Sequence, residues 1–205
     1  DISRDDQLRN NLSIERIGDN SYLSIGGWAF QTLRLDDKQG LVPVAIPEID
    51  YRLRLDDPLL GGKVQLQANT LAIGRTAGQD TQRAFASAEW NLRRITGMGQ
   101  EVNFTLLSRG DLYHSDENAA TITELYRGDE GFKGRGIFAA AAEIKWQFVG
   151  AAFGGTQVLT PRVQLVAANA TSNFSLPNED ARAVDLEDTN LFALNRFPGY
   201  DRFED

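Results

Sequence analysis

The stretch AEIKWQF, residues 142–148, alternates apolar and polar side chains at every position. Because successive side chains of a β-strand point to opposite faces, this stretch would have one apolar and one polar face. After a glycine-rich turn near residues 150–156, residues 159–167 repeat the alternation. The pattern predicts two antiparallel strands and leaves open whether their apolar face meets a second sheet or lipid.

The same two-residue period recurs outward along most of the chain. It is clearest in residues 41–55, where Ala45, Pro47 and Ile49 begin the apolar face and Glu48 and Asp50 begin the polar one. We therefore expect an all-β fold, an antiparallel up-and-down meander of about eight long strands. Further copies of the pattern lie in residues 8–15, 63–69, 83–93 and 101–106.

Two segments break the pattern. Residues 111–135 are polar and predict an interruption of the strands, with a helical turn near residues 119–126. Beyond residue 170 the alternation stops, and the remainder is irregular and acidic. We expect a barrel segment over residues 1–171 and a long acidic loop on the extracellular side over residues 172–205.

Strand length and the sorting of the connections favour a membrane protein. The expected strands of about 10–14 residues exceed the usual 5–6 and suit the ≈ 9–11 needed to cross a bilayer. Connections near residues 18, 58, 97 and 153 are short and glycine-rich, whereas those near 37, 78, 123 and 190 are more polar, and two of them are long. Short turns at one end and long loops at the other are typical of outer-membrane barrels, so we expect a segment of a large transmembrane β-barrel.

Aromatic residues and prolines each allow two interpretations. Aromatic side chains near the strand ends fit an interfacial girdle, or else ordinary core packing. Three prolines within the strand pattern fit strand starts and bulges, or else weakened pairing in a barrel that opens. The aromatic residues are Tyr51, Trp90, Trp146 and Phe148, and the prolines are Pro43, Pro47 and Pro161.

Composition narrows the function classes. The chain has 205 residues, a formal net charge of −8 and no cysteine. Nucleic acid is not expected as a partner because no basic stripe is present, and thiolate metal sites and disulfides are excluded. The sequence starts at Asp1 without a methionine, so we expect a piece of a longer protein.

Catalysis, a metal and a cofactor are not expected. His114 is the single histidine, and its neighbour Ser115 would point to the opposite face of a strand, which does not suit a serine–histidine pair. An acidic run could hold calcium, but its spacing matches no EF-hand loop, and a solvated loop is the simpler interpretation. The run consists of Glu179, Asp180, Asp185, Glu187 and Asp188.

The polar faces of the strands would line an aqueous lumen. Their arginines could bind phosphate groups, balance the lumen carboxylates or contact a plug protein, and the sequence leaves these three roles open. The candidate lumen-facing residues are Glu48, Asp50, Arg52, Arg54, Arg83, Glu89, Arg93, Glu143, Lys145 and Arg162.

One motif near the end of the chain resembles a known family. It consists of Asn195, Arg196, Phe197, Pro198, Gly199, Tyr200, Asp201 and Arg202. This motif resembles a signature stretch of LptD, the lipopolysaccharide-assembly protein of the Gram-negative outer membrane. Residues 159–165 and 46–51 are weaker matches to strands of that family. Ion pairs of Arg196, Asp201, Arg202 and Glu204 could fold this loop back into the lumen.

The resemblance implies a transport function without catalysis or cofactor. Members form a very large barrel that holds an LptE-like plug lipoprotein and receives lipopolysaccharide from a periplasmic LptA-like bridge through an N-terminal domain. Lipopolysaccharide then leaves sideways into the outer leaflet. This chain resembles a segment from the middle of such a barrel, embedded in membrane lipid, with the lateral gate outside it. A porin-like channel or a barrel enzyme, and a soluble ligand-binding β-sandwich, are the alternatives.

Overall fold

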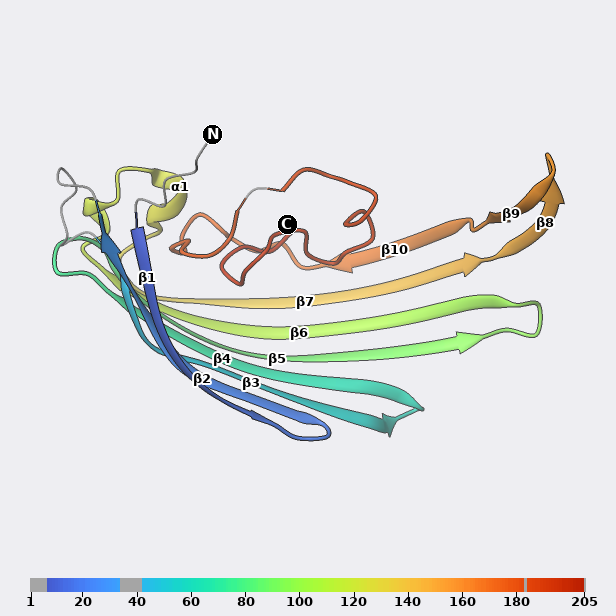
Figure 1. Cartoon of the computed structure of the whole chain (residues 1–205), viewed down its shortest axis with the longest axis horizontal. Coiled ribbons are helices and arrows are strands. Elements are labelled where there is room, and N and C mark those ends of the chain that lie inside the picture. The colour runs from blue at the N-terminus through green and yellow to red at the C-terminus, as the bar shows by residue number, and fades with distance from the viewer. Residues whose placement is uncertain (1–6, 34–41, 183, 205) are drawn as a thin grey trace.

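The structure is a computed structural model that describes residues 7–33, 42–182 and 184–204. Its main sheet has eight strands in the order β1-β2-β3-β4-β5-β6-β7-β10, and β8 and β9 form a separate hairpin (Figure 1). The elements are β1 (Gln7–Ile17), β2 (Ser21–Thr32), β3 (Val44–Leu59), β4 (Gly62–Gly74), β5 (Asp80–Ile95), β6 (Gln100–Asp116), η2 (Asn118–Ala120), α1 (Glu124–Arg127), β7 (Gly131–Trp146), β8 (Phe148–Ala152), β9 (Gly155–Leu159) and β10 (Arg162–Ala168).

The all-β antiparallel meander predicted from the sequence is confirmed. Each strand of the main sheet pairs antiparallel with the next, and β10 returns beside β7. The sheet is open within this chain, with β1 and β10 at its edges. Its longest strand has 17 residues. An open sheet of such long strands fits a segment of a large barrel.

The connections are sorted by length, as the sequence indicates. At one end, called the short-turn end, β3 joins β4 through Leu60 and Gly61, and β8 joins β9 through Phe153 and Gly154. Positive φ at both residues of each pair is the geometry of tight hairpin turns. At the other end, called the loop end, residues 75–79 and 117–130 form longer connections, and the predicted loop near residue 37 lies outside the described residues.

The expected interruption at residues 111–135 is wrong at both of its edges. Strand β6 continues to Asp116 and β7 begins at Gly131, so only residues 117–130 leave the sheet. The short helices η2 and α1 lie where the helical turn was expected. No helix in the described part of the chain is long and apolar enough to cross a membrane.

Prolines occupy strand starts and a bulge. Pro43 and Pro161 directly precede β3 and β10, and Pro47 lies where the β3–β4 register shifts. Because of this shift, the prediction that Ala45 and Ile49 share one apolar face is wrong. Ala45 is instead buried in a small cluster with Leu71 and Ile73.

One row of directly paired residues defines the two faces of the sheet. Asp50, Asn69, Phe85, Asp111 and Arg135 follow one another across β3 to β7. This row lies on the concave face of the curved sheet, against which residues 172–204, called the tail, pack (Figure 1). The opposite, convex face carries exposed Phe104, Leu106, Phe138, Ile144 and Leu165.

Candidate functional site

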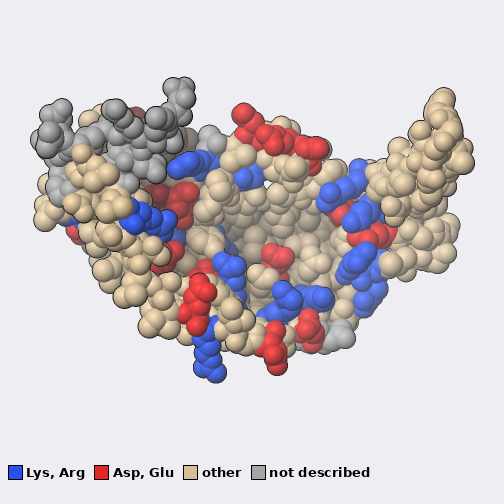
Figure 2. Space-filling view, in the orientation of Figure 1, with Lys and Arg blue, Asp and Glu red and all other residues tan. Residues whose placement is uncertain are grey.

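The ten polar residues singled out from the sequence all share the concave face. Each lies an even number of positions along a regular strand from the defining row, or pairs with a residue that does. Basic and acidic side chains gather around the hollow of the sheet (Figure 2). The tail contacts only part of this surface, so the face divides into a tail-covered half towards the loop end and an open half towards the short-turn end.

Three strand arginines form the centre of the tail-covered half. Arg83 on β5, Arg109 on β6 and Arg135 on β7 are buried and are called the arginine cluster. Arg109 Nε donates to one carboxylate oxygen of Asp111 and Arg135 Nε donates to the other, each at 2.6 Å. Asp111 therefore holds two of the three guanidiniums in place from within the sheet.

The tail carboxylate of Asp201 completes the cluster. Asp201 Oδ1 accepts hydrogen bonds from Arg83 Nη1 at 2.6 Å and from the Tyr113 hydroxyl at 3.0 Å. Arg83 also donates to Asp180 at 2.6 Å and to Asn69 at 3.2 Å. Such charge-assisted bonds among buried groups are strong, and losing one partner leaves the other uncompensated.

Two tail carboxylates bind the backbone of each other's segment. Asp201 Oδ2 accepts from the backbone N–H groups of Glu179 and Asp180 at 2.7 and 3.2 Å. Asp180 Oδ1 accepts from the N–H groups of Tyr200 and Asp201, both at 3.0 Å. Gly199 makes this possible, since its φ is +78° and a Cβ there would come within 2.6 Å of Asp180 Oδ1.

Tyr200 inserts its ring beside the cluster. Its ring packs on Phe85 with 4.7 Å between centroids, and the Arg109 guanidinium lies 4.0 Å from the Phe85 ring centre. The Tyr200 hydroxyl accepts from Gln67 at 3.0 Å and donates to Asp50 at 3.4 Å. Tyr200 therefore extends the contact of the tail from β6 to β3.

The other signature residues mostly stabilise the tail itself. Arg196 pairs with Glu204, and Asn195 donates to the carbonyl of Arg202 at 3.0 Å. The Arg202 side chain donates to the carbonyls of Leu125 and Leu176. Among the signature residues, Asp201 therefore forms an ion pair with a strand, whereas Arg202 binds backbone oxygens.

The open half holds a second set of ion pairs. Glu101 accepts from Arg93 and from Lys145, the latter at 2.7 Å. At the β10 edge the tail reaches further, since the buried Glu143 pairs with Arg162, whose guanidinium lies 3.8 Å from the ring centre of tail Phe192. The Arg93 side chain is 63% exposed against 4% for Arg83, so the two halves differ in access to water.

The pKa values of the two tail aspartates shift in opposite directions. Burial disfavours the charged form of Asp201, but the Arg83 guanidinium and the backbone donors outweigh it and lower the pKa of Asp201. Burial, and then the negative charge of Asp201, raise the pKa of Asp180 more than Arg83 lowers it. Asp201 is therefore the permanent anion of this pair.

Sequence reasoning missed most of the arginine cluster. Arg109, Asp111, Tyr113 and Arg135 lie in or beside residues 111–135, for which the sequence predicts an interruption of the strands. The two-residue spacing of Arg109, Asp111 and Tyr113 along β6 was a usable signal. The exposed Arg54 and Glu48 were found by alternation, although neither belongs to the cluster.

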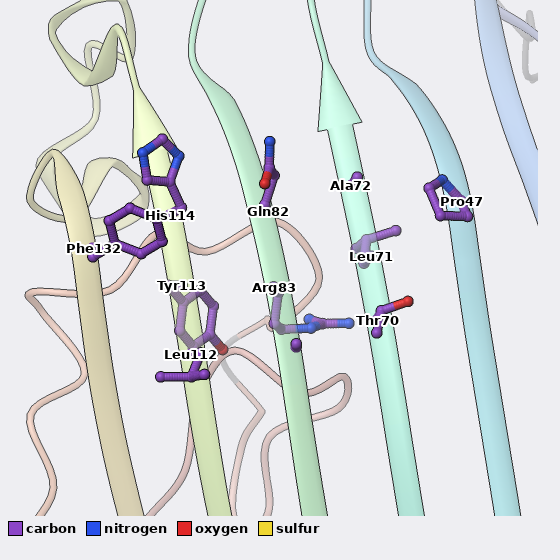
Figure 3. A pocket seen from close by; sticks show the side chains of 11 residues that line it. Pro47, Thr70, Leu71, Ala72, Gln82, Arg83, Leu112, Tyr113, His114 and Phe132 are labelled. Atoms are coloured by element: carbon purple, nitrogen blue, oxygen red, sulfur yellow. The ribbon is translucent and has the colours of Figure 1, made fainter.

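The convex face carries a shallow depression of ≈ 270 Å³ at the loop end (Figure 3). The His114 ring packs at a tilt against Phe132 there, with 4.3 Å between ring centres, while neighbouring Ser115 lies on the concave face and donates to the carbonyl of Asp129. Within the described residues, no group of three or more His, Cys, Asp or Glu side chains is placed to hold a metal ion. The acidic run does not form such a group; its Glu179 binds Arg75 at 2.8 Å.

The two faces define a class of protein. An open antiparallel sheet of long strands, apolar and bare on its convex side and charged on its concave side, is the wall of a membrane β-barrel in form. Within that class, the family model of LptD, described as LPS transport system D, matches residues 1–205. The chain therefore belongs to the LptD family, an outer-membrane family of Gram-negative bacteria that transports lipopolysaccharide and is not an enzyme family. A search of curated proteins finds no match.

Proposed function

We propose that this chain forms part of the wall of an outer-membrane translocon that delivers lipopolysaccharide to the outer leaflet. Its convex face would meet membrane lipid, and its concave face would line an aqueous lumen. The observation that carries this proposal is the contrast between the faces. Large apolar side chains such as Phe138 and Leu165 are exposed on one face, and charged side chains lie on the other. Such an apolar surface is costly in water and stabilising in lipid.

The tail would occupy the lumen at the loop end and narrow it there. The open half would then face cargo or an LptE-like plug lipoprotein, with Arg54, Glu89 and Arg93 as the available contacts. An LptA-like bridge would deliver lipopolysaccharide to the whole protein through a periplasmic domain. The convex depression with His114 and Phe132 would lie against membrane lipid.

The alternatives fit less well. A soluble β-sandwich buries its apolar face against a second sheet, whereas here the tail packs on the charged face and the apolar face is bare. A porin-like channel or a barrel enzyme would share the two faces, but the family match favours transport of lipopolysaccharide.

Arginine substitutions in the full-length protein test the orientation of the wall. Ile144→Arg on the convex face should destabilise the barrel by about 2–4 kcal/mol if this site lies near the bilayer midplane. Gln147→Arg, just beyond the end of β7, should have a small effect. Urea unfolding in lipid vesicles measures the first quantity, and antibody labelling of lipopolysaccharide on cells depleted of the native protein measures delivery. Equal tolerance of both substitutions would contradict the proposal.

A further inference from the structure

The strands carry more positive charge at the arginine cluster than they neutralise themselves. The guanidiniums of Arg83, Arg109 and Arg135 face one strand carboxylate, that of Asp111, which leaves two positive charges. Asp180 and Asp201 bring two carboxylates to the same place from the tail. The strand residues alone therefore form an anion site, and the tail supplies its present occupant.

The atoms through which the described tail residues accept hydrogen bonds from the cluster are all oxygens. Asp201 Oδ1 lies 2.6 Å from Arg83 Nη1, and the Tyr200 carbonyl oxygen lies 2.7 Å from Arg109 Nη2 and 3.2 Å from Arg135 Nη2. The Asp201 carbonyl oxygen lies 3.1 Å from Arg135 Nη1. Several acceptor oxygens with full or partial negative charge, shared among planar guanidiniums, are also what a phosphate group offers.

The tail is attached in a way that allows it to leave. Each hydrogen bond between its described residues and the strands involves a side chain, as in those from Arg83 to the Asp201 carboxylate and from Arg135 to the Asp201 carbonyl oxygen. The backbone hydrogen bonds that join its described residues to other segments run to the β6–β7 connection, between Asn178 and Tyr126 and between Ser175 and Asp129. Releasing the tail from the sheet therefore breaks no strand pairing.

We propose that the arginine cluster is a phosphate-binding site and that the tail is a strap which leaves it when a phosphate group of the transported glycolipid binds. The choice of glycolipid as ligand rests on the transport function proposed above. The two occupants compete, so phosphate weakens tail docking by the same factor by which the docked tail weakens phosphate binding. The concave face would then open at the loop end only when cargo is present.

Hydrogen exchange of four tail amides reports the release directly. The N–H groups of Glu179, Asp180, Tyr200 and Asp201 are bonded to the carboxylates of Asp180 and Asp201 only while the strap is folded. In the full-length protein, in its complex in detergent, phosphorylated lipopolysaccharide should speed their exchange by about tenfold or more. The same lipopolysaccharide after enzymatic removal of its phosphates should leave the exchange rate unchanged.

A third probe, inorganic pyrophosphate, separates the two sources of phosphate. Release by both pyrophosphate and phosphorylated lipopolysaccharide supports a site that recognises phosphate itself. Release by lipopolysaccharide alone supports a site that requires phosphate on a glycolipid. No release by phosphorylated lipopolysaccharide, or equal release by its dephosphorylated form, overturns the proposal.

A matched pair of tail variants tests the competition. Asp201→Asn removes the charge of the occupant, so the lipopolysaccharide concentration that half-saturates the site should fall by about tenfold. Glu204→Gln removes a tail carboxylate that pairs with Arg196 outside the cluster, and it should leave that concentration unchanged. An equal shift in both variants, or none in Asp201→Asn, would show that the cluster has a structural role only.

Delivery of lipopolysaccharide is measured on cells that carry the native protein and each variant. If the native protein delivers lipopolysaccharide while its tail amides stay protected from exchange, the strap proposal fails and the transport function stands. If the native protein does not support delivery, the transport function fails, whatever the exchange rates show.

Discussion

The two halves of the concave face use the same residue types under different conditions. In the tail-covered half, Arg83 and Asp201 are almost completely buried, whereas in the open half Arg93 reaches water beside Glu101. Buried ion pairs are costly to break because the remaining charge is left without a partner, and exposed pairs contribute little. The comparison teaches that charged residues alone do not mark the structural centre of this face. The centre is marked by the charged residues that the tail buries.

Removal of one arginine from each half should give the largest difference. Arg83→Ala leaves Asp201 buried without its main partner, and we expect about 3–5 kcal/mol of lost tail docking. Arg93→Ala should leave the tail unaffected, because Arg93 pairs with a residue of the open half. Amide exchange at residues 179–201 of the full-length protein measures both, and equal effects would remove the distinction between the halves.

A glycine pair sharpens the comparison at the backbone. Gly199→Ala forces a side chain into a left-handed conformation and against Asp180, and we expect a loss of about 1–3 kcal/mol in tail docking. Gly97→Ala, in a turn at the short-turn end, meets no atom within 4 Å of its Cβ and should be mild. Trypsin cleavage at the exposed Arg182 of the tail should be faster in the first variant than in the second.

The alternation of the sequence predicted the sheet because strand pairing is a regular, local property. It failed near Arg109 and Arg135 for a physical reason. The convex positions directly beside these two arginines include Gly110, Gly134 and Gly136, so the apolar side of the alternation is interrupted there. The side chains of such a strand still alternate between the two faces, but the alternation is not visible as a change between apolar and polar residues.

The path of the tail could not be derived in the same way. Its contacts join residues far apart in the sequence, such as Asp201 with Arg83 and Tyr200 with Gln67, and they follow no period. Resemblance to a family signature marked residues 195–202, and ion pairs of charged residues at positions 196–204 were one way in which the loop could fold back into the lumen. The choice of partner, and the burial of the resulting pairs, depend on how the sheet curves around the tail.

Acid should affect tail docking in two opposite steps. The pKa of Asp180 is raised, so its protonation on falling pH relieves repulsion and tightens docking slightly. The pKa of Asp201 is lowered, so its contribution is complete above the ordinary aspartate pKa of about 4 and is lost as the pH falls through the lower folded value. Exchange rates measured as a function of pH should therefore pass through a minimum, after correction for the intrinsic pH dependence of exchange. Asp180→Asn should abolish the first step and retain the second; a single monotonic loss in both proteins would contradict this assignment.

The smallest effect is expected where a tail ion pair reaches water. Arg196 and Glu204 belong to the tail like Asp180 and Asp201, but both side chains are about one-third exposed. The Arg196 guanidinium lowers the pKa of Glu204 mainly through a direct hydrogen bond, which water can replace when the arginine is removed. Arg196→Gln should therefore change tail exchange far less than Arg83→Ala, although it alters a residue of the family-like signature. A large effect would mean that the signature acts through the fold of the tail itself, and not through the buried contact of Asp201 with the strands.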